Sequence, residues 1–188
     1  MTREEEALSM VLSLLDRIGI PYMLTGSVAA SYHGRPRATH DSDVVIDPTP
    51  DQLGALVRDL LDREFYVHAE RALEALRSRR PFNVIDTRYA CKVDLIIRRE
   101  RPYSAEEFAR RVSVDLSLGR PVSVVSAEDA VLSKLEWARA GGDSERQLAD
   151  AAGIVAVNRS LDRAYIEHWA AELRVLDLWR RLIRETVG

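Results

Sequence analysis

Leu24–Ile46 reads LTGSVAASYHGRPRATHDSDVVI, and this stretch decides the expected fold. One apolar run ends at Gly26-Ser27, and a second begins with Asp41-Ser42-Asp43. A Gly-Ser step allows a tight turn into a helix, whose free backbone N–H groups can bind a phosphate. The two aspartates supply the oxygen ligands preferred by the metal ions that accompany phosphates. The segment therefore offers both halves of a nucleoside-triphosphate site.

The spacing of the two aspartates matters because side chains alternate between the faces of a strand. Asp41 and Asp43 share one face, roughly 7 Å apart along the strand. Val44 and Ile46 point to the opposite face, where they can enter a core. Two carboxylates that converge repel each other, and a divalent cation relieves the repulsion. The pattern therefore predicts a metal-binding strand.

A third carboxylate is expected on a neighbouring strand. Cys91–Ile97 reads CKVDLII, an apolar run in which Asp94 is the only acidic residue. The odd-numbered residues would form the buried face, which leaves Lys92 and Asp94 together on the other face. Asp41, Asp43 and Asp94 are therefore the candidate metal ligands.

The lysine content of the chain points to the same regions. Of the 27 basic residues only Lys92 and Lys134 are lysines, and the other 25 are arginines. Lysine is a compact point charge suited to a phosphate, whereas arginine is a wide fork. Survival of two lysines by chance is the alternative. Lys134 is expected at the margin of an apolar helical stripe, free to reach a ligand, and that stripe comprises Ala130, Val131, Leu135 and Ala138.

These motifs together resemble the nucleotidyltransferase superfamily typified by DNA polymerase beta and kanamycin nucleotidyltransferase. The resemblance rests on the strand ending in Gly26-Ser27, the Asp41-x-Asp43 strand and the later Asp94 strand, and it covers residues 22–97 well. Within the superfamily, the small bacterial branch that includes abortive-infection nucleotidyltransferase toxins is the most similar. Ser42 departs from the family pattern, which usually has an apolar residue between the two aspartates.

The resemblance implies a reaction and assigns roles in it. Asp41, Asp43 and Asp94 would hold two Mg²⁺ (or Mn²⁺) ions, and Asp94 would also serve as general base. An NTP would be the donor and a hydroxyl group the acceptor. RNA or protein is the favoured acceptor, as in a toxin–antitoxin system, and a small molecule such as an aminoglycoside stays open. The residues assigned to the nucleotide are Gly26, Ser27, Arg37 and Lys134.

The expected fold is α/β (α+β), with a mixed nucleotidyltransferase-type sheet, flanking helices and a helical C-terminal lobe. Residues 1–126 would form the core and residues 127–188 the lobe, packed together as one compact unit. Helical spacing predicts a helix over 4–18, and the Thr49-Pro50 start signal predicts one over 51–61. Residues 27–33 are expected as the phosphate-facing helix that Gly34 ends. A Ser104-x-x-Glu107 capping box predicts another helix from Ser104. The charged segment 70–80 has no clear assignment.

Composition limits the function classes. The chain has 188 residues, 46% of them hydrophobic, and a formal net charge of −3. That charge argues against nonspecific nucleic-acid binding over the whole surface. No apolar stretch approaches the length of a membrane span, so a cytoplasmic protein without a membrane partner is expected. The single cysteine, Cys91, cannot form an internal disulfide and is expected in the core.

Two other functions remain open from the sequence. The chain could be a catalytically silent nucleotidyltransferase-like binding module, although such a module has no reason to retain three mutually repelling carboxylates. It could also be a Mg²⁺-dependent nuclease or phosphatase, which uses clustered aspartates but has no need of the Gly-Ser turn.

Overall fold

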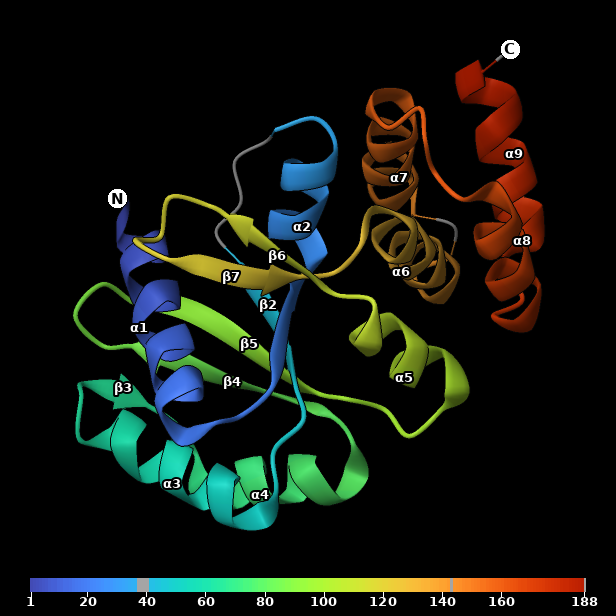
Figure 1. Ribbon diagram of the computed structural model, residues 1–188. Helices are drawn as coiled ribbons and strands as arrows, with labels where there is room; N and C mark the ends of the chain where they lie inside the picture. Colours follow the sequence, from blue (N-terminus) through green and yellow to red (C-terminus); the bar gives the residue numbers. More distant parts are fainter. Residues whose placement is uncertain (37–40, 143, 188) are drawn as a thin grey trace. The chain divides into compact units, whose positions relative to one another are not determined.

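The computed structural model describes residues 1–36, 41–142 and 144–187. The chain divides into two compact units (Figure 1). The first comprises residues 1–25 and 39–124, and the second comprises residues 26–38 and 125–188. This division differs from the expected boundary at residue 126 mainly in segment 26–38, which groups with the C-terminal helices.

The first unit is built around a seven-stranded mixed sheet with strand order β3-β4-β5-β2-β1-β7-β6. Its strands are β1 (Tyr22–Thr25), β2 (Ser42–Ile46), β3 (Phe65–Tyr66), β4 (Pro81–Asp86), β5 (Cys91–Ile97), β6 (Val112–Asp115) and β7 (Pro121–Val124). Its helices are α1 (Arg3–Ile18), α3 (Pro50–Leu61), α4 (Ala69–Ser78) and α5 (Pro102–Ala109). The expected fold class, α/β (α+β) with a mixed sheet and flanking helices, is confirmed.

Parallel and antiparallel pairings alternate near the centre of the sheet. β2 runs parallel to β5 and antiparallel to β1, and β1 runs parallel to β7. β6 and β7 form an antiparallel hairpin around Gly119-Arg120-Pro121. In β2 and β5 buried and half-buried residues alternate along the chain, as expected for strands with one face in the core.

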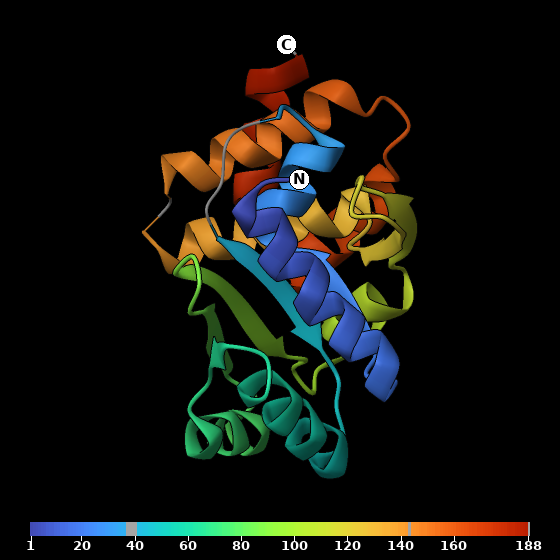
Figure 2. The ribbon, with the colours of Figure 1, turned by 90° about the vertical axis from the view of Figure 1, so that its left-hand side faces the viewer.

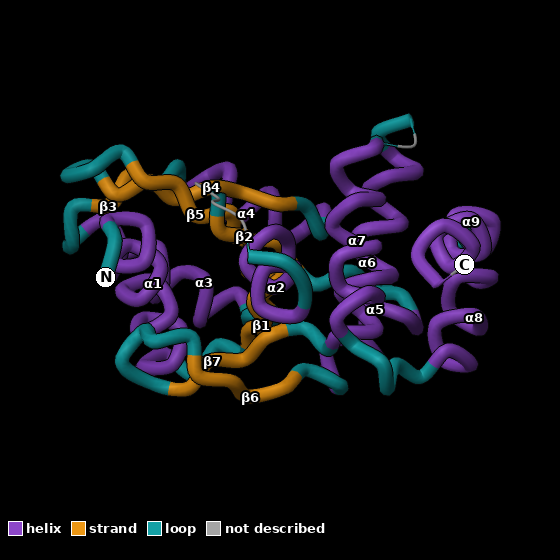
Figure 3. Tube along the Cα trace, turned by 90° about the horizontal axis from the view of Figure 1, so that it is seen from above, coloured by secondary structure: helices purple, strands orange, loops and turns teal. Residues whose placement is uncertain are grey.

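Helices α1 and α3 pack on one face of the curved sheet, between its β3–β4–β5 part and its β7–β6 part (Figure 3). Helix α4 lies beside α3 at one end of the unit (Figure 2). The core of this layer is aliphatic, and its fully buried side chains include Leu12, Leu15, Leu53, Leu56, Leu95 and Ile97.

Local sequence signals account for the ends of α1 and α3. Thr2 caps α1 in a capping box with Glu5, and the helix ends at Gly19, whose φ of 77° suits glycine. Thr49 caps α3 in the same way with Gln52, and Pro50 follows at the first helical position. These two helices are therefore specified locally as well as by packing.

The second unit is entirely helical in the residues that the structure describes. It contains α2 (Gly26–His33), α6 (Ala127–Ala140), α7 (Glu145–Val157), α8 (Arg163–Glu172) and α9 (Leu176–Val187). Helix α2 packs on α6 and α7. Gly34 ends α2 so close to α7 that a Cβ there would come within 2.9 Å of the backbone nitrogen of Ile154. A side chain at Gly34 would therefore push α2 away from α7.

The structure assigns the segment that the sequence left open and corrects the start of one helix. The unassigned segment 70–80 forms α4, which ends at Ser78. Helix α5 begins at Pro102 rather than Ser104, and the Ser104 hydroxyl instead accepts a 2.9 Å hydrogen bond from Nε of Arg101. Trp137 on α6 is 55% exposed. Proline at the first helical position outweighed the capping-box signal in α5.

Within the described ranges, no helix is both long and apolar enough to cross a membrane.

An ion pair between the buried Asp86 and the partly exposed Arg88 organises the turn between β4 and β5. Asp86 is fully buried, and its Oδ1 accepts hydrogen bonds from the Arg88 backbone at 2.9 Å and from Arg88 Nε at 3.1 Å. Its Oδ2 accepts a bond from Nη2 of Arg88 at 2.6 Å. These bonds lower the pKa of Asp86, while burial opposes that shift. Arg88 also reaches Glu6 of α1 at 3.2 Å, which ties the turn to the helix layer.

We expect Asp86→Asn to lower the free energy of unfolding at pH 7 by about 2 kcal/mol, the range for hydrogen bonds to a charged group. The folded-state pKa of Asp86 lies below its unfolded value, so its stabilisation is present above about pH 4 and declines at lower pH. Urea unfolding at pH 7 and pH 3 measures both effects. Asp59→Asn, in the exposed pair with Arg17, is the control and should cost much less. Equal losses in the two variants would contradict the assignment.

Candidate active site

Two predicted carboxylates meet across the parallel pair β2 and β5. Asp43 and Asp94 are direct register partners on these strands. Both residues are half-buried and share the face opposite the core residues Val44, Val93 and Leu95. Asp41 directly precedes β2, and its side chain is 63% exposed. The predicted sharing of one sheet face by Asp43, Lys92 and Asp94 is therefore present.

Lys92 joins two of the predicted carboxylates. Its Nζ lies 2.8 Å from Oδ2 of Asp94 and 3.5 Å from Oδ1 of Asp41. Hydrogen bonding to Asp94 raises the pKa of Lys92, and burial opposes that shift. The sequence placed Lys92 on the correct face, but it gave no sign that the ammonium would contact Asp41 as well.

The chemistry of the donor set fits a divalent cation. Carboxylate oxygens are hard ligands of the kind that Mg²⁺ prefers. No three His, Cys, Asp or Glu side chains converge as a metal cage among the residues that the structure describes. Instead the Lys92 ammonium takes the position of a cation between Asp41 and Asp94. We conclude that the aspartates suit Mg²⁺ and that Lys92 places a positive charge beside Asp41 and Asp94 in this structure.

The predicted phosphate turn has the expected local form. Gly26 has φ of +64°, a left-handed conformation that other residues seldom adopt, and it opens α2 directly after β1. The residue before it, Thr25, is the register partner of Asp43. Ser27 occupies the first turn of α2. Arg37, the fourth predicted nucleotide ligand, lies outside the described residues.

Within its own unit, α2 is fixed at its C-terminal end. Nε2 of His33 lies 2.7 Å from the carbonyl oxygen of Val125, and burial lowers the pKa of His33. The amide of Asn158 donates a 2.5 Å hydrogen bond to the His33 carbonyl. These contacts anchor α2 to the segments that begin α6 and end α7.

Lys134 was expected at the margin of a buried stripe and free to reach a ligand, and this placement was wrong. Its side chain is only 6% exposed, and Nζ donates a 2.8 Å hydrogen bond to Oδ2 of Asp150 on α7. The stripe itself is buried as expected. A buried ammonium requires an anionic or hydrogen-bonding partner, and the sequence alone did not indicate that Asp150 is the partner of Lys134. The available signal was that the next helix along the chain, α7, carries a carboxylate that could pair with Lys134.

A second buried carboxylate stabilises the start of α6. Asp129 is fully buried, and it accepts hydrogen bonds of 2.7 Å from the Ser126 hydroxyl and from the Tyr165 hydroxyl. Ser126 also caps α6 by accepting a bond from the Asp129 backbone at 3.2 Å. Asp129 therefore has a structural role in holding α6 against α8.

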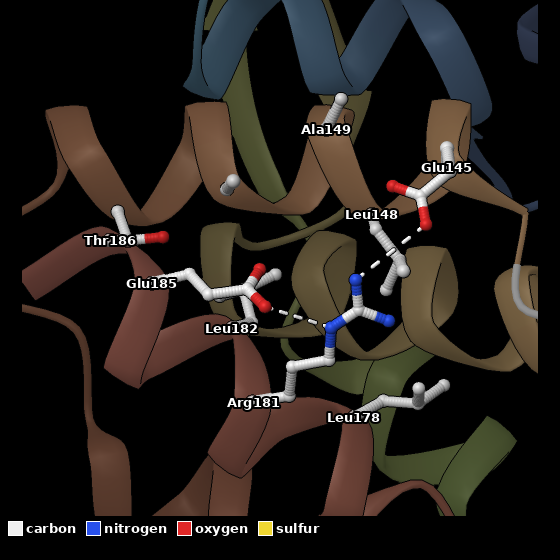
Figure 4. Close-up of a pocket in the computed structure, with 9 residues that line it drawn as sticks. Glu145, Leu148, Ala149, Leu178, Arg181, Leu182, Glu185 and Thr186 are labelled. Atoms are coloured by element: carbon white, nitrogen blue, oxygen red, sulfur yellow. Dashed lines mark hydrogen bonds and ion pairs between the residues drawn. The ribbon is translucent and has the colours of Figure 1, made fainter.

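The second unit also contains a pocket of about 200 Å³ between α7 and α9 (Figure 4). Its apolar lining includes Leu148, Leu178 and Leu182. Arg181 lines it, with Nε 2.9 Å from Glu185 and Nη2 3.6 Å from Glu145. An arginine already held by two glutamates is poorly placed to bind a phosphate. Of the predicted site residues that the structure describes, none lines this pocket.

The sequence and the structure were compared with those of known proteins. No protein-family model and no curated protein matches the sequence. Solved structures do match. The crystal structure of ANT(2'')-Ia in complex with adenylyl-2''-tobramycin has a TM-score of 0.60 at 17% identity, covering 92% of this chain and 98% of that chain. An antigenic nucleotidyltransferase-like protein from Paracoccidioides brasiliensis has a TM-score of 0.61 at 16% identity, with coverages of 97% and 88%.

A third match is the lincosamide antibiotic adenylyltransferase LnuA with bound lincomycin. Its TM-score is 0.55 at 14% identity, covering 84% of this chain and 99% of that chain. The chain has the nucleotidyltransferase fold. Identities this low speak for the nucleotidyltransferase fold alone, so activity must be argued from the residues of this chain.

The buried pair on α6 and α7 yields a stability prediction. We expect Lys134→Met to lower the free energy of unfolding by about 3 kcal/mol, because it leaves Asp150 buried without its ammonium partner. Adding Asp150→Leu should recover most of that loss, since two apolar side chains can replace a buried pair at little cost. Chemical denaturation of the single and double variants tests this. A Lys134→Met protein as stable as the parent would contradict the pairing.

Proposed function

We propose that this chain is a metal-dependent nucleotidyltransferase that moves a nucleoside monophosphate from an NTP to a hydroxyl acceptor. The observation that carries the proposal is the register of Asp43 with Asp94 on neighbouring parallel strands, with Asp41 linked to Asp94 through Lys92. The nucleotidyltransferase fold supports it. A fold without an aligned carboxylate set would support only a binding module.

The three aspartates have distinct parts in the proposed reaction. Asp41 and Asp43 would hold Mg²⁺ or Mn²⁺, and Asp94 would complete the site from β5. When bound, two such ions neutralise the leaving pyrophosphate and lower the pKa of the attacking hydroxyl. Asp94 is the proposed acceptor of the hydroxyl proton, because a general base must lie beside the nucleophile.

The proposed phosphate ligands are Gly26, Ser27, Arg37 and Lys134. The N–H groups that open α2 suit a phosphate, since a helix N-terminus favours negative charge. Lys134 can serve only by exchanging Asp150 for a phosphate oxygen, because its ammonium already donates to that carboxylate. Exchange of one anionic partner for another would keep the buried charge compensated.

The acceptor is proposed in two classes. The sequence resemblance favours RNA or protein, as for a toxin-like enzyme of a bacterial toxin–antitoxin pair. The structural neighbours favour a small molecule, because one was solved with adenylyl-2''-tobramycin and another with lincomycin. Both classes present the hydroxyl that the proposed reaction needs.

A labelling experiment distinguishes these outcomes. The protein is incubated with each α-labelled NTP and Mg²⁺ or Mn²⁺, in separate reactions containing cell extract, an aminoglycoside or a lincosamide. Transfer of label to RNA, protein or the antibiotic, with release of pyrophosphate, is expected. Release of phosphate without incorporation would indicate a nuclease or phosphatase instead. Absence of both reactions under all conditions would favour a silent binding module.

Asp43→Asn separates chemistry from folding. The substitution keeps the shape of the side chain and removes its charge, so we expect transfer to fall by about 10³-fold, equivalent to roughly 4 kcal/mol of transition-state stabilisation. The thermal stability of the metal-free protein should not decrease. Asp47→Asn is the matched control, because Asp47 follows the same strand and binds Arg98 at 2.8 Å. Near-normal transfer by Asp43→Asn would exclude Asp43 from catalysis.

A further inference from the structure

Lys92 contacts carboxylates from two separate parts of the chain. Asp94 lies two residues along the same strand, whereas Asp41 directly precedes β2. The ammonium is 2.8 Å from the first and 3.5 Å from the second. The Lys92 side chain is 38% exposed, so its flexible four-carbon stem has room to move.

The arrangement compensates charge in the absence of metal. Asp43 and Asp94 are directly opposite each other, and like charges at that position destabilise a sheet. A third carboxylate, Asp41, adds to the repulsion. One ammonium between Asp41 and Asp94 offsets part of it.

A metal ion cannot bind Oδ1 of Asp41 and Oδ2 of Asp94 while the Lys92 ammonium stays in contact with the same two oxygens. Mg²⁺ binds carboxylate oxygens at about 2.0–2.1 Å. An ammonium 2.8 Å from the same Asp94 oxygen would then face a doubly charged cation at close range. A metal ion on that oxygen would therefore displace the ammonium.

We propose that Lys92 is an internal counterion of the Asp41, Asp43 and Asp94 cluster and that a metal ion displaces it, so that Lys92 tunes the metal affinity of the site. The inference rests on the proposed function, since it uses the same carboxylates as metal ligands. Lys92 is a positioning residue in this scheme, because it acts on the carboxylates and needs no contact with substrate.

The choice of lysine agrees with this role. In a chain with 25 arginines and two lysines, both lysines contact aspartates. Arginine forms rigid two-pronged bonds to carboxylates, whereas lysine is a single flexible charge that can leave. A displaceable counterion therefore suits lysine better than arginine.

The test compares Lys92→Met with the parent protein. The apparent Kd for Mn²⁺ alone, measured by electron paramagnetic resonance of free Mn²⁺, should fall by about tenfold, which corresponds to 1.4 kcal/mol. In EDTA at low ionic strength, the melting temperature of Lys92→Met should fall by about 2–4 °C. Adding Asp94→Asn should restore the melting temperature, because it removes one of the repelling charges.

Two controls isolate the effect of position. Arg17→Gln removes one positive charge from the exposed pair with Asp59, so it gives the same net charge as Lys92→Met. It should leave Mn²⁺ affinity unchanged. Lys92→Arg keeps the charge and should not bind Mn²⁺ more tightly than the parent. Tighter binding in Arg17→Gln equal to that in Lys92→Met would show a general charge effect and overturn the proposal.

The outcomes separate this inference from the proposed function. If the parent binds Mn²⁺ and Lys92→Met binds it with the same Kd, the counterion role is overturned and the proposed transferase stands. If neither protein binds Mn²⁺ at millimolar concentration, the metal site fails, and the counterion role and the proposed function fall together.

Discussion

The parallel pairing of β2 with β5 is the constraint on which the candidate site depends. It sets Asp43 opposite Asp94, and the opposite faces of the same residues form the core. Because side chains alternate, a shift of one residue in either strand would move its carboxylate to the buried face. Burial of Val44, Ile46, Val93 and Leu95 therefore fixes the carboxylate positions. The hydrophobic core and the candidate chemistry are specified by one register.

This register brings like charges together, and the chain compensates them locally. Lys92 lies between Asp41 and Asp94, and in the other unit Lys134 is buried against Asp150. The Lys92 ammonium lies where a metal cation is proposed to bind, and the Lys134 ammonium lies where a phosphate is proposed to bind. The difference is exposure, because Lys92 can reach water and Lys134 is almost fully enclosed. We infer that displacing Lys92 costs less than displacing Lys134.

Because side chains alternate along a strand, the sequence predicted the shared face of Asp43, Lys92 and Asp94. It also predicted the turn at Gly26, because glycine readily adopts the left-handed conformation that the turn uses. Helix α4 was not assigned because only small residues, Ala72 and Ala75, enter the core from it. The burial of Lys134 also escaped prediction, since it depends on Asp150 sixteen residues later. Pairings that form only when two helices meet leave no periodic signal in the chain.

The central claim is that Asp43 and Asp94 hold one metal ion between β2 and β5. Anomalous diffraction from crystals containing Mn²⁺ and a nonhydrolysable NTP tests it most directly, because the anomalous signal locates the ion itself. We expect a peak at coordination distance, about 2.0–2.3 Å, from carboxylate oxygens of both residues, with the Lys92 ammonium moved away from Asp94. A fully occupied Mn²⁺–nucleotide complex with no anomalous peak at these carboxylates would contradict it.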